Sequence, residues 1–195
     1  MESGIEVIVN NVTKHISLTP SELDFYTSLF EIRKLKKKEF LFRSGSVCKH
    51  EYFVSKGCLR TFTVDKDSVE HTAMFAIEDW FTGDIYSFLT GLPSKNNIMA
   101  IEESEVLLLS KKNWEKLLEQ VPKFEKLYRI KFQNSFIALE QRMMLSLSDS
   151  AEERYLHFIE KYPMFEQRIP QKYIASYLGI TPEFLSVIRR KIAGK

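Results

Sequence analysis

Hydrophobic positions alternate, or gather in short runs, through the middle of the chain from about Ile32 to Ser110. The runs are Glu39–Phe42, Glu51–Val54, Leu59–Val64, His71–Ala76 and Glu105–Leu109. Turn-forming residues separate them, as at Ser44-Gly45, Lys56-Gly57 and Thr82-Gly83-Asp84. Many short strands at intervals of about 8–12 residues predict a β-sandwich or jelly roll. Ahead of it, a capping signal at Thr19-Pro20 and helical spacing of apolar residues predict short helices within residues 5–30.

The basic run Arg33–Lys38 begins this strand-rich region. A nucleic-acid-binding patch is one interpretation. We favour a solvent-facing strand, because lysines commonly protect exposed strand edges from pairing with another chain.

The pattern becomes helical again after Lys111, and from about Pro122 to Leu147 no glycine or further proline interrupts it. Apolar residues recur there at spacings of three and four, which predicts one long helix with an apolar stripe. The stripe consists of Tyr128, Phe132, Phe136, Leu139, Met143 and Leu147. Other faces carry Leu127, Ile130 and Ile137, so this helix needs more than one partner. We expect it to pack on the β domain and also on the same helix of a second copy.

The last part of the chain has the pattern of a helix-turn-helix. Gly179 is suited to the left-handed turn that ends a first helix. Thr181, Pro182 and Glu183 then supply an N-cap, a first-turn proline and a favourable charge for a second helix. A shared core is expected from Ile174, Leu178, Leu185 and Ile188. Such a unit commonly places its second helix in the major groove of DNA.

Charge supports this interpretation of the C-terminal unit. The whole chain carries a net charge of +2, yet six basic residues and one acid lie between Arg168 and Lys195. A local basic excess is the electrostatic footprint of a nucleic-acid-binding surface, although a solvated basic tail would look the same. The chain contains no apolar run long enough to span a membrane, and its first residues lack a signal-peptide pattern. We therefore expect a cytoplasmic protein that does not associate with membranes.

Metal chemistry and enzyme activity are not expected. The two cysteines, Cys48 and Cys58, lie ten positions apart and are best interpreted as half-buried thiols. A metal-dependent jelly-roll enzyme would need a cluster of histidines, and the β region offers only His50 and His71.

The order of these elements resembles the cyclic-AMP receptor protein/Fnr (Crp/Fnr) family of bacterial transcription regulators. The matching segments are Phe40–Gly45, Phe53–Arg60, Trp80–Ile85 and Ala100–Leu108. The short C-terminus is similar to variants common in Bacteroidetes-type genomes. The resemblance implies an α+β fold, with a β-roll sensor domain at residues 1–121, a dimerisation helix at 122–148 and a helix-turn-helix domain at 149–195. Because little chain follows Lys191, the β wing of a winged helix is expected to be absent or reduced.

The resemblance also implies an effector pocket, for which the candidates are Gly83, Asp84, Ile85, Ser94 and Lys95. Cyclic-nucleotide binders of the family carry a Gly-Glu pair for the ribose and an Arg before Ser or Thr for the cyclic phosphate. Gly83-Asp84 matches the pair with a shorter carboxylate, but Ser94 stands at the Arg position. Lys95 beside it lacks the bidentate fork of a guanidinium. We therefore expect no certain cofactor, an unknown small-molecule effector other than cyclic AMP, or an empty pocket.

The recognition helix implied by the resemblance spans about residues 181–191. Its expected base-facing residues are Thr181, Pro182, Glu183, Ser186, Val187 and Arg190. Candidate phosphate contacts are Gln171, Lys172 and Arg189, with helix capping as the other interpretation of Gln171. The family often has Arg at the position of Val187, and valine can only touch a thymine methyl group. We therefore expect the operator preference to differ.

The sequence predicts a homodimeric regulator that binds double-stranded DNA, with RNA polymerase as a further candidate partner. The alternative is a ligand-binding or interaction module whose DNA-binding domain is degenerate. Binding of DNA by the isolated protein separates the two.

Overall fold

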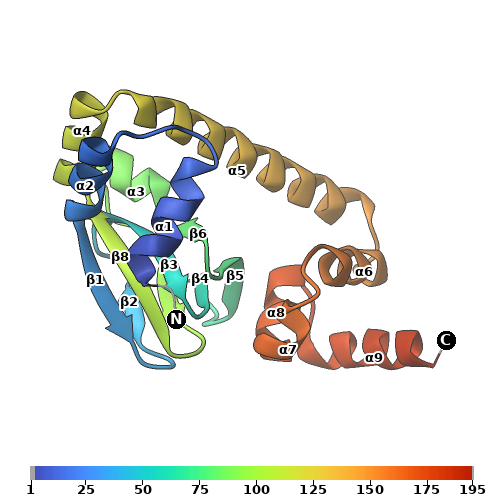
Figure 1. Cartoon of the computed structure of the whole chain (residues 1–195). Coiled ribbons are helices and arrows are strands. Elements are labelled where there is room, and N and C mark those ends of the chain that lie inside the picture. The colour runs from blue at the N-terminus through green and yellow to red at the C-terminus, as the bar shows by residue number, and fades with distance from the viewer. Residues whose placement is uncertain (1–2, 195) are drawn as a thin grey trace.

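The computed structural model describes residues 3–194, and it opens with two short helices, α1 (Gly4–Thr13) and α2 (Pro20–Ser28). Each helix begins with a capping box, in which Ser3 or Thr19 accepts a hydrogen bond from the backbone N–H three residues later. Both helices lie beside the sheets of the N-terminal domain (Figure 1). The expected helical start of the chain is confirmed.

Eight strands form the N-terminal domain. They are β1 (Phe30–Leu35), β2 (Phe40–Phe42), β3 (His50–Lys56), β4 (Leu59–Val64), β5 (Glu70–Ala76), β6 (Trp80–Thr82), β7 (Asn97–Ala100) and β8 (Ser104–Ser110). They pair into two four-stranded antiparallel sheets, in the orders β1-β8-β3-β6 and β2-β7-β4-β5. The predicted jelly roll is confirmed. Its strands β6 and β7 were not predicted, because each is short and has no clear alternation.

The two sheets enclose an apolar core. Val54, Leu59, Ile98 and Val106 come from four different strands and are fully buried in one cluster. The basic run that follows Ile32 behaves only partly as predicted. Its first half lies in the largely exposed β1, but β1 ends at Leu35 and the remaining lysines form a turn.

Three helices follow or interrupt the strands: α3 (Ile85–Thr90), α4 (Lys111–Gln120) and α5 (Lys123–Ser148). α5 has 26 residues, which corresponds to a length of about 39 Å. Its first turns pack on the β-roll through Phe124, Leu127 and Tyr128. The rest of α5 runs away from the roll toward the C-terminal helices (Figure 1). The predicted long helix is confirmed with nearly the expected ends.

The C-terminal unit contains α6 (Ala151–Lys161), α7 (Phe165–Arg168), α8 (Gln171–Leu178) and α9 (Pro182–Ala193). α8 and α9 form the predicted helix-turn-helix. Gly179 has a φ of 70°, and the Thr181 hydroxyl accepts a hydrogen bond of 3.2 Å from the Phe184 N–H. The segment 163–170, between α6 and α8, contains the one-turn helix α7, whose Phe165 fills the core of this unit.

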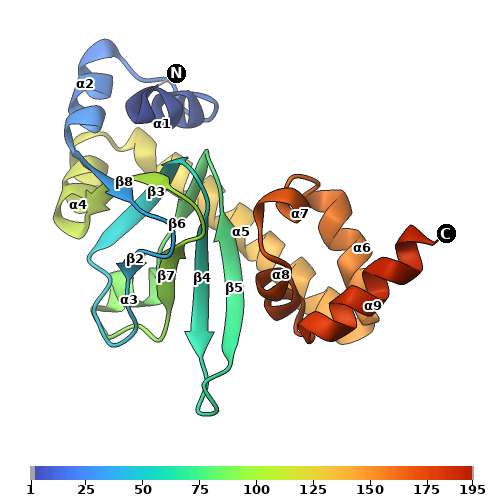
Figure 2. The ribbon, with the colours of Figure 1, turned by 90° about the horizontal axis from the view of Figure 1, so that it is seen from below.

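The C-terminal unit shares a hydrophobic core with the roll. Phe75 and Ile77 from the roll lie in one buried cluster with Phe158, Phe165 and Ile174 from the helices. In the view from below, α8 lies beside β5 (Figure 2). The two units are therefore docked on each other and are not joined by α5 alone. Within residues 3–194, no helix combines the length and the apolar character needed to cross a membrane.

Candidate nucleic-acid interface, dimer helix and effector loop

The residues predicted to read bases lie together on the outer face of α9. Those exposed there are Thr181, Pro182, Glu183, Ser186, Val187 and Arg190. Leu185 and Ile188, on the opposite side of the helix, are buried against α8 and α6. The amphipathic pattern therefore presents to solvent one face on which polar and charged side chains, among them Glu183 and Arg190, are mixed with apolar ones. Arg189 is only half exposed, and its Nε lies 3.5 Å from the Glu166 carboxylate.

The expected phosphate contacts Gln171 and Lys172 begin α8 and are exposed. The residue in the N-cap position of α8 is Pro170, and no side chain caps this end. Gln171 therefore does not serve as a helix cap, which was its other interpretation. Lys172 reaches over the ring of Tyr173, with Nζ at 4.9 Å from the ring centroid.

Sequence reasoning missed one feature of the recognition face. Phe184 lies in the first turn of α9 and is 49% exposed. Helical spacing from buried Leu185 and Ile188 places it off the core face, and this signal was readable in the sequence. An exposed aromatic ring there can make apolar contact with a thymine methyl group, as Val187 can.

The C-terminal two thirds of α5 carry an apolar face that this chain does not cover. Phe136 is 66% exposed and Leu147 is 77% exposed. We call the exposed face the α5 stripe, which consists of Phe132, Phe136, Leu139, Met143 and Leu147. Ile137 and Met144 widen it. Exposed apolar faces of this kind are typical of surfaces that bind another molecule.

Tyr128 was expected to belong to this stripe, but the structure places it elsewhere. It is 6% exposed and lies in the core between α5 and the roll. Its hydroxyl donates a hydrogen bond of 2.7 Å to the Glu51 carboxylate. The stripe begins one turn later, because the first turns of α5 are consumed by contacts with the β domain.

Asp84, the expected effector ligand, is engaged within the chain. It caps α3, accepting 2.9 Å from the Ser87 N–H, and it also accepts from the Ser94 hydroxyl and, at 2.8 Å, from Asn96. Burial alone would raise the pKa of Asp84, but these hydrogen bonds outweigh it and hold the pKa below its ordinary value. The Asp84 carboxylate therefore holds the loop 91–96 onto α3.

The other expected pocket residues do not converge on a cavity. Ser94 is buried, and its backbone bonds the turn at Gly45 and Ser46. Ile85 and Lys95 are exposed. A cyclic nucleotide needs a free carboxylate for its ribose and a guanidinium for its phosphate. The residues present do not fit such a ligand, because Asp84 is already bonded and segment 83–100 contains no arginine.

We expect the Asp84→Ala variant to lose about 1–3 kcal/mol of unfolding free energy near neutral pH, because three donors lose their acceptor. Asp84→Asn, which keeps an acceptor for the cap, should lose less. Because the pKa of Asp84 is lower in the folded chain than in the unfolded chain, the carboxylate stabilises the fold fully above the unfolded-state pKa of about 3.9. This stabilisation is lost as the pH falls through the folded-state pKa of Asp84. Urea unfolding should therefore show the Ala deficit shrinking below about pH 4. A deficit independent of pH would contradict the role of the carboxylate.

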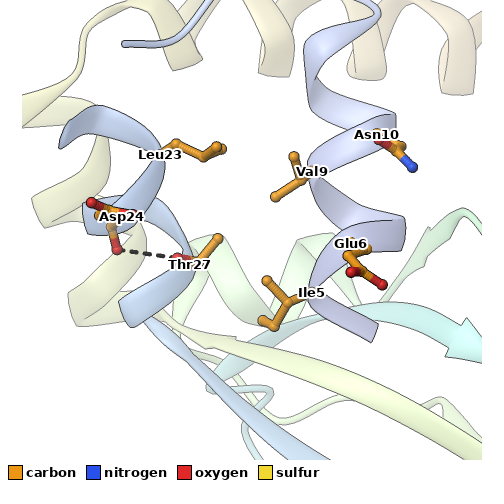
Figure 3. A pocket seen from close by; sticks show the side chains of 7 residues that line it. All are labelled: Ile5, Glu6, Val9, Asn10, Leu23, Asp24 and Thr27. Atoms are coloured by element: carbon orange, nitrogen blue, oxygen red, sulfur yellow. Dashed lines mark hydrogen bonds between the residues drawn. The ribbon is translucent and has the colours of Figure 1, made fainter. Parts of the chain in front are cut away.

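The structure has a cavity of about 490 Å³ elsewhere, between α1 and α2. Its lining consists of Ile5, Glu6, Val9, Asn10, Leu23, Asp24 and Thr27. Ile5, Val9 and Leu23 point into the space between the two helices (Figure 3). A second cavity, of about 380 Å³, is lined by mixed charges, including Lys34, Lys56 and Glu103. Neither contains a residue that was expected in the effector pocket.

The cysteines are buried and unpaired. Burial raises the pKa of the Cys58 thiol to about 12 and also raises that of Cys48, which disfavours the reactive thiolate. Across residues 3–194, no group of three His, Cys, Asp or Glu side chains is placed to hold a metal ion.

The fold and the exposed surfaces define the class of protein. A β-roll domain is joined by a long helix, whose C-terminal part is exposed, to a helix-turn-helix unit that packs on the roll. Residues 32–121 match the cyclic nucleotide-binding domain family. The transcriptional activator protein Anr of Pseudomonas aeruginosa is 28% identical over 190 residues, covering 88% of this chain and 74% of that protein. The fumarate and nitrate reduction regulatory protein of Vibrio cholerae is 27% identical over 185 residues, covering 87% of this chain and 72% of that protein.

Solved structures share the fold. FixK2 from Bradyrhizobium japonicum superimposes with a TM-score of 0.70 at 20% identity, over 85% of each chain. A CooA mutant from Carboxydothermus hydrogenoformans gives a TM-score of 0.71 at 16% identity, over all of this chain and 86% of that one. With the matched domain, these findings show that the chain is similar, over most of its length, to transcription regulators of the Crp/Fnr family. The relatives are regulators and not enzymes.

Proposed function

We propose that the chain is a homodimeric transcription regulator that binds a pseudo-palindromic DNA operator. The observation that carries this proposal is the exposed face of α9, which presents Glu183, Ser186 and Arg190 on a helix-turn-helix that follows a long helix. In this arrangement α9 enters the major groove while the N-terminus of α8 contacts the phosphate backbone.

The α5 stripe supplies the reason for a dimer. Pairing α5 with its copy about a two-fold axis buries the stripe of both chains in one self-complementary interface. It also yields two recognition helices related by that axis, which suits half-sites about one helical turn, or about 34 Å, apart.

The base-reading chemistry follows from the side chains on α9. Arg190 is able to donate two hydrogen bonds to guanine O6 and N7, and Glu183 is able to accept from the amino group of cytosine. Val187 and Phe184 favour thymine through its methyl group. The chain therefore reads a mixed half-site, with apolar contacts where relatives often have a second arginine.

The roll acts in this proposal as a regulatory domain that does not respond to cyclic AMP. Support comes from the Asp84 carboxylate, whose oxygens are bonded to Ser87, Ser94 and Asn96. In this proposal the roll either binds a different small molecule as its effector or binds no effector.

The test is selection of binding sites from random-sequence duplex DNA with the purified full chain, followed by footprinting. We expect an inverted repeat to be enriched and protected on one face of the duplex, with no change when cyclic AMP is added. Absence of any binding at low salt would refute the proposal. Tighter binding with cyclic AMP would refute the part concerning the effector.

A further inference from the structure

The outer edge of strand β5 is covered by the DNA-binding unit. β5 is the last strand of its sheet, so its outward backbone groups have no strand partner. Ser176, on α8, satisfies two of them. Its hydroxyl accepts 2.9 Å from the Thr72 N–H and donates 2.6 Å to the Glu70 carbonyl. The first helix of the helix-turn-helix therefore takes the place of a neighbouring strand.

Arg142, on α5, joins three elements at the same edge. Its guanidinium donates to the carbonyls of Thr72 (3.1 Å) and Ala73 on β5, and to that of Tyr177 (3.0 Å) on α8. It also lies over the Tyr177 ring, 4.0 Å from the centroid. Arg142 directly precedes Met143 of the α5 stripe, so the same part of α5 carries both this contact and the exposed apolar face.

Arg60 supports the contact from inside the roll. Its side chain is fully buried, donates 2.7 Å to the Thr72 hydroxyl and pairs with Glu70. The guanidinium lies between two rings, 4.3 Å from the Phe62 centroid and 4.0 Å from that of Tyr173 on α8. Undocking α8 would remove one of these rings from a buried cation, which adds to the cost of separation.

We infer that this contact, formed by Ser176 and Arg142 on the edge of β5, fixes the position of the recognition helix relative to the dimer axis. The inference rests on the proposed function. Ser176 and Arg142 are positioning residues, since neither lies on the exposed face of α9. The docked unit leaves that face open to solvent, so docking does not block DNA.

The physical consequence concerns the spacing of half-sites. Without the contact, the C-terminal unit loses its polar bonds to the edge of β5. It is then held by the apolar cluster around Phe75 and Phe165, by the ion pairs of Arg168 with the roll, and by the short connection at Asp149 and Ser150. A freer unit spends less time at the separation that one operator requires, which lowers the effective concentration for the second half-site. Binding to a single half-site is unaffected, because the base-reading residues are unchanged.

The experiment compares Ser176→Ala and Arg142→Gln with matched controls remote from the contact, Thr13→Ala and Arg33→Gln. Probes are duplexes that carry the half-site selected by the wild-type protein, either singly or as inverted repeats whose spacer changes by one base pair at a time. We expect both variants to bind the optimal repeat about 10–100-fold more weakly and to lose their spacing preference. Single half-site affinity should match the controls.

Hydrogen exchange without DNA tests the docking separately. Backbone amides of β5 and α8 should exchange faster in both variants than in the controls, while those of β3 and β8 stay protected. Unchanged exchange, or faster exchange with an unchanged spacing preference, would overturn the inference. If the wild-type protein binds no DNA, the proposed function fails. The hydrogen-exchange test does not depend on DNA, so exchange rates in the variants that equal those of the controls would refute the docking contact independently.

Discussion

The Leu139→Glu variant is expected to be monomeric at concentrations where the wild-type protein is a dimer. Leu139 is exposed in the single chain and lies in the middle of the α5 stripe. Burial of a leucine side chain contributes about 1.5–3 kcal/mol to the free energy of association. In a two-fold interface Leu139 of both chains is buried, so this contribution is made twice. The substitution removes that contribution and places two carboxylates near each other in an apolar seam. Light scattering after size exclusion measures the change.

Operator binding should fail along with dimerisation. A monomer presents one recognition helix, so it loses the avidity that links two half-sites, and affinity for the full operator should fall about 100-fold or more. The fold should survive, because the side chain is exposed in the isolated chain.

Asn134→Glu is the matched control for Leu139→Glu. Asn134 is exposed on the same helix, and at 100° per residue it lies on the opposite face from the stripe. It should remain dimeric and bind DNA normally. A dimeric Leu139→Glu variant, or a monomeric Asn134→Glu variant, would show that the helices do not pair through the stripe.

The local signals in the sequence were sufficient for the helix-turn-helix. Gly179 and Thr181 each fix one backbone position through their own chemistry, so the turn and the helix start could be predicted without tertiary information. The alternating strands were similarly readable, because two-residue periodicity follows from burial of one face.

Tyr128 shows where periodicity stops being informative. A spacing of three and four identifies one face of α5, but it does not say where along the helix the packing against the roll ends. That boundary depends on the height of the β domain, which is a property of the whole fold.

The resemblance assigns Asp84 to an effector, but the local sequence favours another role. An aspartate directly before a short helix is also a strong N-cap, and the structure uses it in that way. The Arg60 guanidinium also donates to the Ser176 hydroxyl, at 3.5 Å, and no signal in the sequence predicts this contact. The two residues are 116 positions apart, and only the docking of α8 on β5 brings them together.

Arg190→Ala should remove discrimination at one position of each half-site. Arg190 is the exposed arginine of the recognition face, and a two-bond contact to guanine is worth about 1–3 kcal/mol of discrimination. We expect affinity for the selected operator to fall by roughly that amount per contact, with little change on unrelated DNA. Competition binding with a series of single-base substitutions measures this. Substitutions at the base pair read by Arg190 should no longer weaken binding by the variant. Substitutions at the other positions should weaken it as much as they weaken binding by the wild-type protein.

Lys172→Ala is the comparison that separates base reading from charge. Lys172 lies in the first turn of α8, which we propose contacts the phosphate backbone. Its loss should therefore weaken binding to all sequences alike and reduce the magnitude of the salt slope by about 1 per contact. The two variants should therefore differ in what they change. Arg190→Ala should change the ratio of specific to non-specific affinity, and Lys172→Ala should change the dependence of affinity on salt concentration. If Arg190→Ala instead weakened every sequence uniformly and flattened the salt slope, Arg190 would be a phosphate contact, and base reading would fall to Glu183, Ser186 and Val187. That result would mean that only the first two turns of α9, which carry Glu183, Ser186 and Val187, enter the groove. The last turns, which carry Arg190, would then lie at the phosphate backbone.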